Sequence, residues 1–195
     1  MQKIKLIALD LDGTALDENS RLTERTKRVL EQAAEAGIYL IAASGRAYSS
    51  LPEDVMALKG LTYAITSNGA ATYDPKKGER SFSCPMEEEK VEELLELLRE
   101  EPETAIEVFW QGHPLASRAF LENPVSYGAP KRVIPYLQQT RTPVNDIYAF
   151  IWEHKKELDA LDIICQGPLN KVEWFDKIYA LGGFYMTSST HYRLE

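Results

Sequence analysis

The alternation of strand-like and helix-like segments in the first third of the chain constrains the fold most. Short apolar runs at residues 4–9, Tyr39–Ala43 and Leu61–Thr66 predict three buried strands. Between the first two runs, Thr23 can cap a helix that Gly37 can end, and a shorter helix is expected before the third. Strands that alternate with helices through short links form parallel sheets. We therefore expect an α/β fold with a Rossmann-like parallel-sheet core.

The pattern changes after the third predicted strand. Residues 71–83 read as a β-hairpin, and residues 87–100 carry leucines at helical spacing among many charges, which predicts an amphipathic helix. Strand-like runs follow at residues 105–110, 146–152 and 170–175. Helical or irregular segments separate these runs, so this half of the chain is expected to have an α+β fold.

These patterns predict three parts along the chain. Residues 1–82 form the N-terminal part of the core, residues 83–187 form an inserted α+β cap, and residues 188–195 form a segment that returns to the core. The remainder of the core is then missing from the 195 residues. We expect the parallel-sheet core to be incomplete in this chain.

Composition excludes some classes of partner. The chain has 22 Lys and Arg against 30 Asp and Glu, and its formal net charge of −8 disfavours nucleic-acid binding through bulk electrostatics. None of its apolar runs approaches the roughly 18 residues that span a bilayer. We therefore expect a cytoplasmic protein that contacts neither nucleic acid nor membrane, with Cys84 and Cys165 as reduced thiols.

Polar loops follow all three predicted parallel strands. The residues concerned are Asp10, Leu11, Asp12, Gly13 and Thr14 after the first strand, Ser44, Gly45 and Arg46 after the second, and Ser67, Asn68 and Gly69 after the third. In open parallel sheets, ligands bind outside the carboxyl ends of the strands. We expect the three loops to converge on one ligand site.

The residue types in these loops favour phosphate chemistry. Asp10 and Asp12 repel each other unless a cation lies between them, and Mg²⁺ binds through one or two carboxylates together with substrate phosphate oxygens. Gly13 lets the backbone turn and present an amide to an anion. Neutral donors for phosphate oxygens are available from Thr14, Ser44 and Asn68, and Arg46 offers a charged one.

A carboxylate in such a site can act as a nucleophile. One Asp can attack phosphorus to form an aspartyl-phosphate, while the other protonates the leaving oxygen and later activates water. The loops therefore predict phosphoryl transfer from a small phosphorylated metabolite.

The motifs DLDGT, ASGR and TSNGA, each after a hydrophobic strand, resemble those of the haloacid dehalogenase superfamily, and more narrowly its Cof-type phosphatases with a IIB cap. The resemblance implies that Asp10 is the nucleophile and a Mg²⁺ ligand. It implies that Asp12 is the general acid and base and binds the metal through its backbone carbonyl. It also implies that Thr14 stabilises the loop and that Ser44 holds the phosphoryl group. The further residues expected to contact phosphate or substrate are Leu11, Gly13, Gly45, Arg46, Asn68 and Gly69.

The sequence departs from this family after the cap. The family has a Lys that neutralises the nucleophile and phosphate, and a GDxxND-like loop that completes the metal site; neither follows here. Lys171 has a strand-like cap setting and is not expected to replace the missing Lys. We expect a truncated chain whose apolar sheet edge is covered by a second chain or a swapped copy. A phosphate dianion beside two carboxylates is then neutralised by Mg²⁺ alone, so weak catalysis or none is expected.

Four functions remain open at this point. The first is a Mg²⁺-dependent phosphatase of sugar phosphates or cofactor-like phosphates, and the second is a phosphomutase that reuses the aspartyl-phosphate. The third is a non-catalytic remnant that binds a ligand or partner. The fourth, a receiver-like phosphoacceptor domain, is disfavoured because such domains lack DxDGT and an inserted cap.

Overall fold

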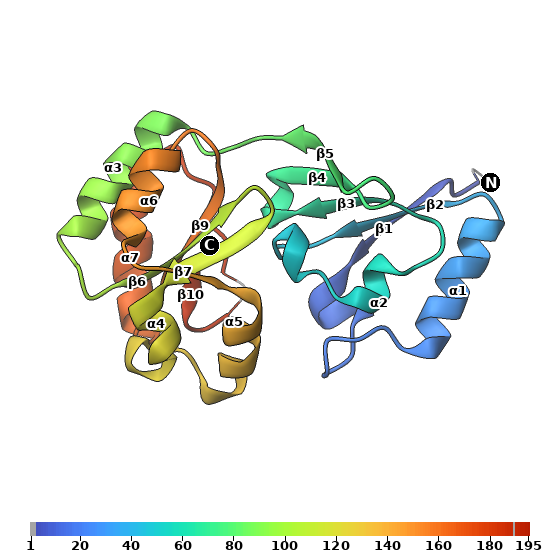
Figure 1. Ribbon diagram of the computed structural model, residues 1–195, viewed down its shortest axis with the longest axis horizontal. Helices are drawn as coiled ribbons and strands as arrows, with labels where there is room; N and C mark the ends of the chain where they lie inside the picture. Colours follow the sequence, from blue (N-terminus) through green and yellow to red (C-terminus); the bar gives the residue numbers. More distant parts are fainter. Residues whose placement is uncertain (1–2, 189) are drawn as a thin grey trace. The chain divides into compact units, whose positions relative to one another are not determined.

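The computed structural model describes residues 3–188 and 190–195. The chain divides into two compact units, Met1–Cys84 (unit 1) and Pro85–Glu195 (unit 2), each drawn in Figure 1. The division falls two residues from the expected start of the cap. The expected return of residues 188–195 to the core stays a prediction, and Arg193–Leu194 pair within the sheet of unit 2.

Unit 1 is built on one mixed five-stranded sheet with the strands in sequence order. The first three strands are parallel, as predicted, and the last two are added antiparallel as a hairpin. The strands are β1 (Leu6–Asp10), β2 (Tyr39–Ala43), β3 (Leu61–Thr66), β4 (Ala71–Asp74) and β5 (Glu79–Ser83). The helices and helical turns are η1 (Leu11–Ala15), α1 (Glu24–Glu35), η2 (Tyr48–Ser50), α2 (Glu53–Met56) and η3 (Ser67–Gly69).

Local chemistry explains where α1 begins and what it covers. Thr23 is its N-cap, and the Thr23 hydroxyl accepts a hydrogen bond from the backbone N–H of Thr26 at 3.1 Å. Leu30 is buried against the β1–β3 side of the sheet, in a cluster with Leu40 and Leu61. This packing confirms the predicted helix and holds one face of the parallel strands.

The first strand is less buried than its apolar sequence predicts. Leu6 is 48% exposed, and Ile4, just before the strand, is 71% exposed. The reason is topological: β1 is the edge strand of this sheet, and among the described residues it pairs with β2 alone. The expected strand is present as β1, but the expectation that it is buried is wrong.

Unit 2 has its own mixed five-stranded sheet, in the order β10-β9-β6-β7-β8. Its pairs are antiparallel except for β7 with β8. The strands are β6 (Ala105–Trp110), β7 (His113–Ser117), β8 (Thr142–Val144), β9 (Leu158–Ile164) and β10 (Arg193–Leu194). The helices and helical turns are α3 (Glu88–Arg99), α4 (Arg118–Glu122), η4 (Pro124–Tyr127), η5 (Lys131–Val133), α5 (Ile134–Thr140), α6 (Ile147–His154) and α7 (Pro168–Leu181).

Two hydrophobic clusters hold unit 2 together. Figure 1 shows α3, α6 and α7 grouped on one side of this sheet, where Leu98, Ile151 and Trp174 are among the buried side chains. A second cluster includes Phe120 of α4 and Leu137 of α5.

The predicted α/β fold is confirmed, with two mixed sheets. In the part of the chain that the structure describes, none of the helices is both long enough and apolar enough to span a membrane.

Two strands expected in unit 2 are helices. Residues 146–152 lie mainly in α6, which the Asp146 carboxylate caps by accepting the Ala149 N–H at 2.9 Å. Residues 170–175 lie in α7, whose first turn contains Pro168. Aromatic and β-branched residues suggested strands, but burial at spacing i, i+4, as in Ile147 with Ile151, decides for helices.

Candidate active site

The three parallel strands of unit 1 end at nearly the same level of the sheet. Asp10, the last residue of β1, pairs with Ala43, the last residue of β2. Ala43 in turn pairs with Ile65, one residue before β3 ends. The loops that follow these strands therefore emerge side by side at one edge of the sheet.

The loop after β1 is anchored by one buried side chain. Leu11 is fully buried, and its carbonyl accepts the Leu16 N–H at 3.0 Å, which closes the turn. Gly13 has φ of +78°, a conformation that a residue with a Cβ adopts at a cost. Leu11 was predicted to contact phosphate; because its side chain is in the core, its backbone is the part left for a ligand.

Thr14 orients the predicted nucleophile. Its hydroxyl donates a hydrogen bond of 2.5 Å to Asp10 Oδ2, across the turn. The bond restricts the Asp10 carboxylate, which is exposed at the end of β1. An exposed, oriented carboxylate is the arrangement that attack on an incoming phosphoryl group needs.

Arg46 holds the second carboxylate with two donors. Its Nε lies 2.8 Å from Asp12 Oδ2, and its Nη2 lies 2.6 Å from Asp12 Oδ1. The guanidinium also donates to Ser20 Oγ at 3.2 Å and to the Ser50 carbonyl at 3.3 Å. The Arg46 side chain is 13% exposed, whereas that of Asp12 is 53% exposed. The structure thus pairs Arg46 with Asp12, while its expected contact with phosphate stays a prediction.

The loops after β2 and β3 are tied to each other. The Ser44 N–H donates to the Ile65 carbonyl at 3.0 Å, and the Ser67 N–H donates to the Arg46 carbonyl at 2.9 Å. Gly45 lies against Asn68, so that a Cβ on Gly45 would sit 2.5 Å from Asn68 Oδ1. These contacts explain why a glycine is needed at position 45 for Asn68 to keep its place.

The third loop has a tight backbone. Asn68 has φ of +53° and Gly69 has φ of +99°, both in the left-handed region. Asn is among the few residues with a side chain that tolerate this conformation. The loop therefore combines an exposed amide side chain, next to Gly45 of the second loop, with an exposed glycine backbone.

The donor set is compatible with Mg²⁺. Among residues 3–188 and 190–195, His, Cys, Asp and Glu side chains form no group of three or more that could hold a metal. Mg²⁺ does not require one, because it commonly binds one or two carboxylates and fills its other positions with water and substrate phosphate. The exposed Asp10 carboxylate and the backbone carbonyl of Asp12 can meet that requirement, since both oxygens of the Asp12 carboxylate are bonded to Arg46.

Two residues of this site, Ser20 and Ser50, were not predicted to act in it, and Ser67 was named only as part of the third loop. Ser20 and Ser50 position the Arg46 guanidinium, and neither belongs to a motif that sequence reasoning could have used. Ser67 lies in the third loop with its Oγ buried and, within the described part of the chain, without a hydrogen-bond partner. Its position next to Asn68 was the available signal.

Comparison with known proteins identifies the family. The sequence profile of the haloacid dehalogenase-like hydrolases matches residues 7–179. The chain belongs to this family. It is 36% identical over 96 residues to a pyridoxal phosphate phosphatase of Escherichia coli, covering 49% of this chain and 35% of that protein. It is 32% identical over 71 residues to the 5-amino-6-(5-phospho-D-ribitylamino)uracil phosphatase of Bacillus subtilis, covering 36% and 28%.

Solved structures share the fold of this chain along nearly its whole length. A haloacid dehalogenase-like hydrolase from B. subtilis superposes with a TM-score of 0.76 at 20% identity, covering 98% of this chain and 72% of that chain. A subclass IIB sugar phosphatase superposes with a TM-score of 0.70 at 14% identity, covering 97% and 68%. The profile match confirms the predicted haloacid dehalogenase family, and these structures share the fold expected for its members with a IIB cap. The matched regions span about a third of the length of the two curated relatives.

Proposed function

We propose that this hydrolase removes phosphate from small phosphorylated metabolites, with Mg²⁺, through an aspartyl-phosphate on Asp10. The observation that carries the proposal is the arrangement of two carboxylates in one loop. Thr14 orients Asp10 by a 2.5 Å hydrogen bond, and Arg46 grips Asp12 by its two oxygens. Asp10 is thus oriented for the role of nucleophile, and Asp12 is the second carboxylate of the loop, to which we assign the role of acid and base.

The reaction divides into two steps that share these groups. In the first, an Asp10 carboxylate oxygen forms a bond to phosphorus, the bond from phosphorus to the ester oxygen breaks, and the carboxyl group of Asp12 gives its proton to the departing oxygen. In the second, the Asp12 carboxylate takes a proton from water as that water attacks phosphorus, which releases phosphate and restores Asp10. Positioned proton transfer of this kind contributes roughly 10²- to 10⁴-fold.

The remaining loop residues bind the phosphoryl oxygens in this proposal. The Ser44 hydroxyl and the Asn68 amide donate from the second and third loops, and the backbone of Gly13, Gly45 and Gly69 approaches closely because these residues have no Cβ. Asp10 and Asp12 would hold Mg²⁺, which neutralises phosphate charge when bound. The guanidinium of Arg46 supplies a further positive charge, which lies next to the Asp12 carboxylate.

The relatives guide the substrate class. The two curated phosphatases act, by their names, on pyridoxal phosphate and on a phosphorylated ribitylaminouracil. One of the solved structures is a sugar phosphatase. We extend this to the chain as a preference for sugar phosphates or cofactor-like phosphate esters.

The open edge of β1 supports a further part of the proposal. Leu6 and Ile4 are exposed beside a strand whose outer backbone groups are available for pairing. Additional polypeptide, from a second chain or a swapped copy, would cover this edge. Without a polypeptide that covers the edge of β1, the chain is expected to hydrolyse its substrate slowly. A cytoplasmic location remains our prediction.

A phosphatase assay tests the proposal. Purified chain with Mg²⁺ and p-nitrophenyl phosphate is expected to release p-nitrophenol slowly, and Asp10→Asn is expected to abolish the release. Release that survives Asp10→Asn contradicts the proposal. Activity that requires an added sugar bisphosphate favours a phosphomutase instead, and folded chain that binds phosphate analogues without any turnover favours a ligand-binding remnant.

A further inference from the structure

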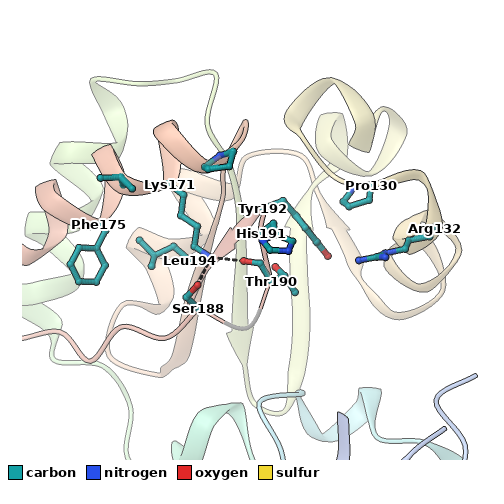
Figure 2. Close-up of a pocket in the computed structure, with 11 residues that line it drawn as sticks. Pro130, Arg132, Lys171, Phe175, Ser188, Thr190, His191, Tyr192 and Leu194 are labelled. Carbon is teal, nitrogen blue, oxygen red and sulfur yellow. Dashed lines mark hydrogen bonds between the residues drawn. The ribbon is translucent and has the colours of Figure 1, made fainter. Parts of the chain in front are cut away.

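Unit 2 contains a pocket that the proposed reaction does not use. Its volume is about 630 Å³, and its lining residues all belong to unit 2. Figure 2 shows α7 on one side of the pocket and the segment with Pro130 and Arg132 on the other, with residues 190–194 between them. The pocket is therefore formed by three segments far apart in the sequence.

The pocket is basic in an acidic protein. The lining includes Arg132, Lys171 and His191 and contains neither Asp nor Glu, although the chain as a whole has a net charge of −8. In Figure 2 the Arg132 and Lys171 side chains approach from opposite sides and point toward the segment that carries Thr190. Cations that converge without a carboxylate among them favour an anionic ligand.

Lys171 is held in place rather than free to swing into solvent. Its ammonium donates to Ser188 Oγ at 2.5 Å and to the Thr190 carbonyl. An ammonium has three N–H donors, so one remains for a ligand after these two bonds. Pre-positioning lowers the entropy lost when an anion binds.

The Thr190 hydroxyl also has an unused hydrogen-bonding capacity. Its Oγ1 is buried at the pocket and, among the residues that the structure describes, has no hydrogen-bond partner. A buried hydroxyl without a partner costs free energy. A phosphate oxygen beside Lys171 would accept a hydrogen bond from this hydroxyl.

One wall of the pocket is apolar. Val172 is 57% exposed and Phe175 is 43% exposed, both on the face of α7 that lines the pocket. Exposed apolar side chains beside the Lys171 ammonium and the Arg132 guanidinium suit a ligand with an anionic end and a flat or apolar end. A bare inorganic ion would leave this wall unused.

The opposite wall depends on one glycine. Gly128 has φ of +97°, and a Cβ at this position would lie 2.6 Å from the Cys165 carbonyl oxygen. This close approach brings the segment that continues to Pro130 and Arg132 against the end of β9. Arg132 follows this anchored glycine by four residues, in η5.

We infer that this pocket binds a small phosphorylated molecule with an apolar or aromatic group. Arg132, Lys171 and the Thr190 hydroxyl would hold the phosphate, and Val172 and Phe175 would pack on the rest. The inference is independent of the proposed hydrolysis, because it involves neither Asp10 nor a reaction step.

Phenylphosphonate is a suitable probe because it has both chemical features and cannot be hydrolysed as an ester. Titration of ¹⁵N-labelled full chain in Mg²⁺-free buffer is expected to shift the amide signals of Lys171, Thr190 and His191. Arg132→Gln is expected to weaken binding at least tenfold, and added salt is expected to weaken it further. Lys131→Gln, an exposed neighbour outside the pocket, serves as the matched control and is expected to change affinity less than twofold.

A second variant guards against a purely structural effect. Lys171→Met retains the aliphatic stem but loses the bonds to Ser188 and Thr190, so its fold is checked by circular dichroism. The inference would be overturned if phenylphosphonate bound without shifting the amide signals of Lys171, Thr190 and His191. It would also be overturned if Arg132→Gln did not weaken binding, or if Ser44→Ala abolished it. Equal affinity for phenylphosphonate and benzyl alcohol would overturn it as well, because the anion would then contribute nothing.

Discussion

Arg46 grips the Asp12 carboxylate by both oxygens, at 2.6 and 2.8 Å, across 34 residues of sequence. The guanidinium is nearly buried and is anchored by Ser20 and Ser50, so it is the fixed member of the pair. The exposed carboxylate takes its orientation from this anchored fork. Arg46 is in this view a positioning residue for the acid and base of the reaction.

Arg46→Lys is expected to lower kcat about tenfold to 100-fold, because an ammonium cannot hold both oxygens at once. The loss is expected to be greater for alkyl phosphates than for p-nitrophenyl phosphate, since a poor leaving group depends more on proton donation. Steady-state rates on both substrates measure this difference. Arg25→Lys, on the exposed face of α1, is the control, and equal losses on the two substrates would argue for a merely structural role.

Gly45→Ala is expected to reproduce the effect of Asn68→Ala. The added methyl group would lie 2.5 Å from Asn68 Oδ1 and displace that side chain. We expect both variants to raise KM severalfold, and the double variant to be no worse than either alone, because they remove the same contact. Additive losses in the double variant would show that the two positions act separately.

Glu107 is expected to be the most sensitive charged residue of unit 2. It is fully buried, accepts two hydrogen bonds from Arg141 at 3.1 and 3.0 Å, and forms an ion pair with Arg193 at 3.2 Å. Burial alone would raise the pKa of Glu107, but the two arginines outweigh it and lower that pKa.

Glu107→Gln leaves buried guanidinium charge uncompensated, and we expect it to reduce the free energy of unfolding by about 3 kcal/mol. Urea denaturation measures the change. Glu96→Gln, exposed on α3, is expected to alter stability by less than about 0.5 kcal/mol. A loss at Glu107 no larger than this control would contradict the account of the buried cluster.

Asp162 is expected to make stability depend on pH. Burial raises the pKa of Asp162 to about 8, despite its ion pair with Arg193. In the unfolded chain this carboxyl group ionises near pH 3.8, so between about pH 4 and pH 8 the folded state binds more protons than the unfolded state. The contribution of Asp162 to stability is therefore lost as pH rises through this window.

Asp162→Asn removes this dependence. The gain in stability of the variant over the wild type is expected to be larger at pH 8 than at pH 5, by about 1 to 3 kcal/mol. Urea denaturation of both proteins at the two pH values measures it. A difference that is constant with pH would show that Asp162 is ionised in the folded protein throughout.

Sequence patterns predicted the parallel strands of unit 1, the capped helix α1 and the convergence of the three loops, because these depend on local apolar periodicity and strand direction. They failed at α6 and α7, where aromatic and β-branched residues favour strands locally but packing of Ile147 and Trp174 against the sheet of unit 2 favours helices. The exposure of Leu6 depends on strand order, which no local pattern contains. The Arg46–Asp12 pair joins two loops, so only the fold could assign Arg46 its partner.

The central claim is that Asp10, together with Mg²⁺, receives the phosphoryl group. Beryllofluoride binds carboxylates as a mimic of aspartyl-phosphate, and its ¹⁹F NMR signal reports the bound state. We predict a protein-bound ¹⁹F signal that requires Mg²⁺, disappears in Asp10→Asn and persists in Asp12→Asn. A bound signal of equal intensity in Asp10→Asn, or the lack of one in correctly folded wild-type chain with Mg²⁺, would contradict the account.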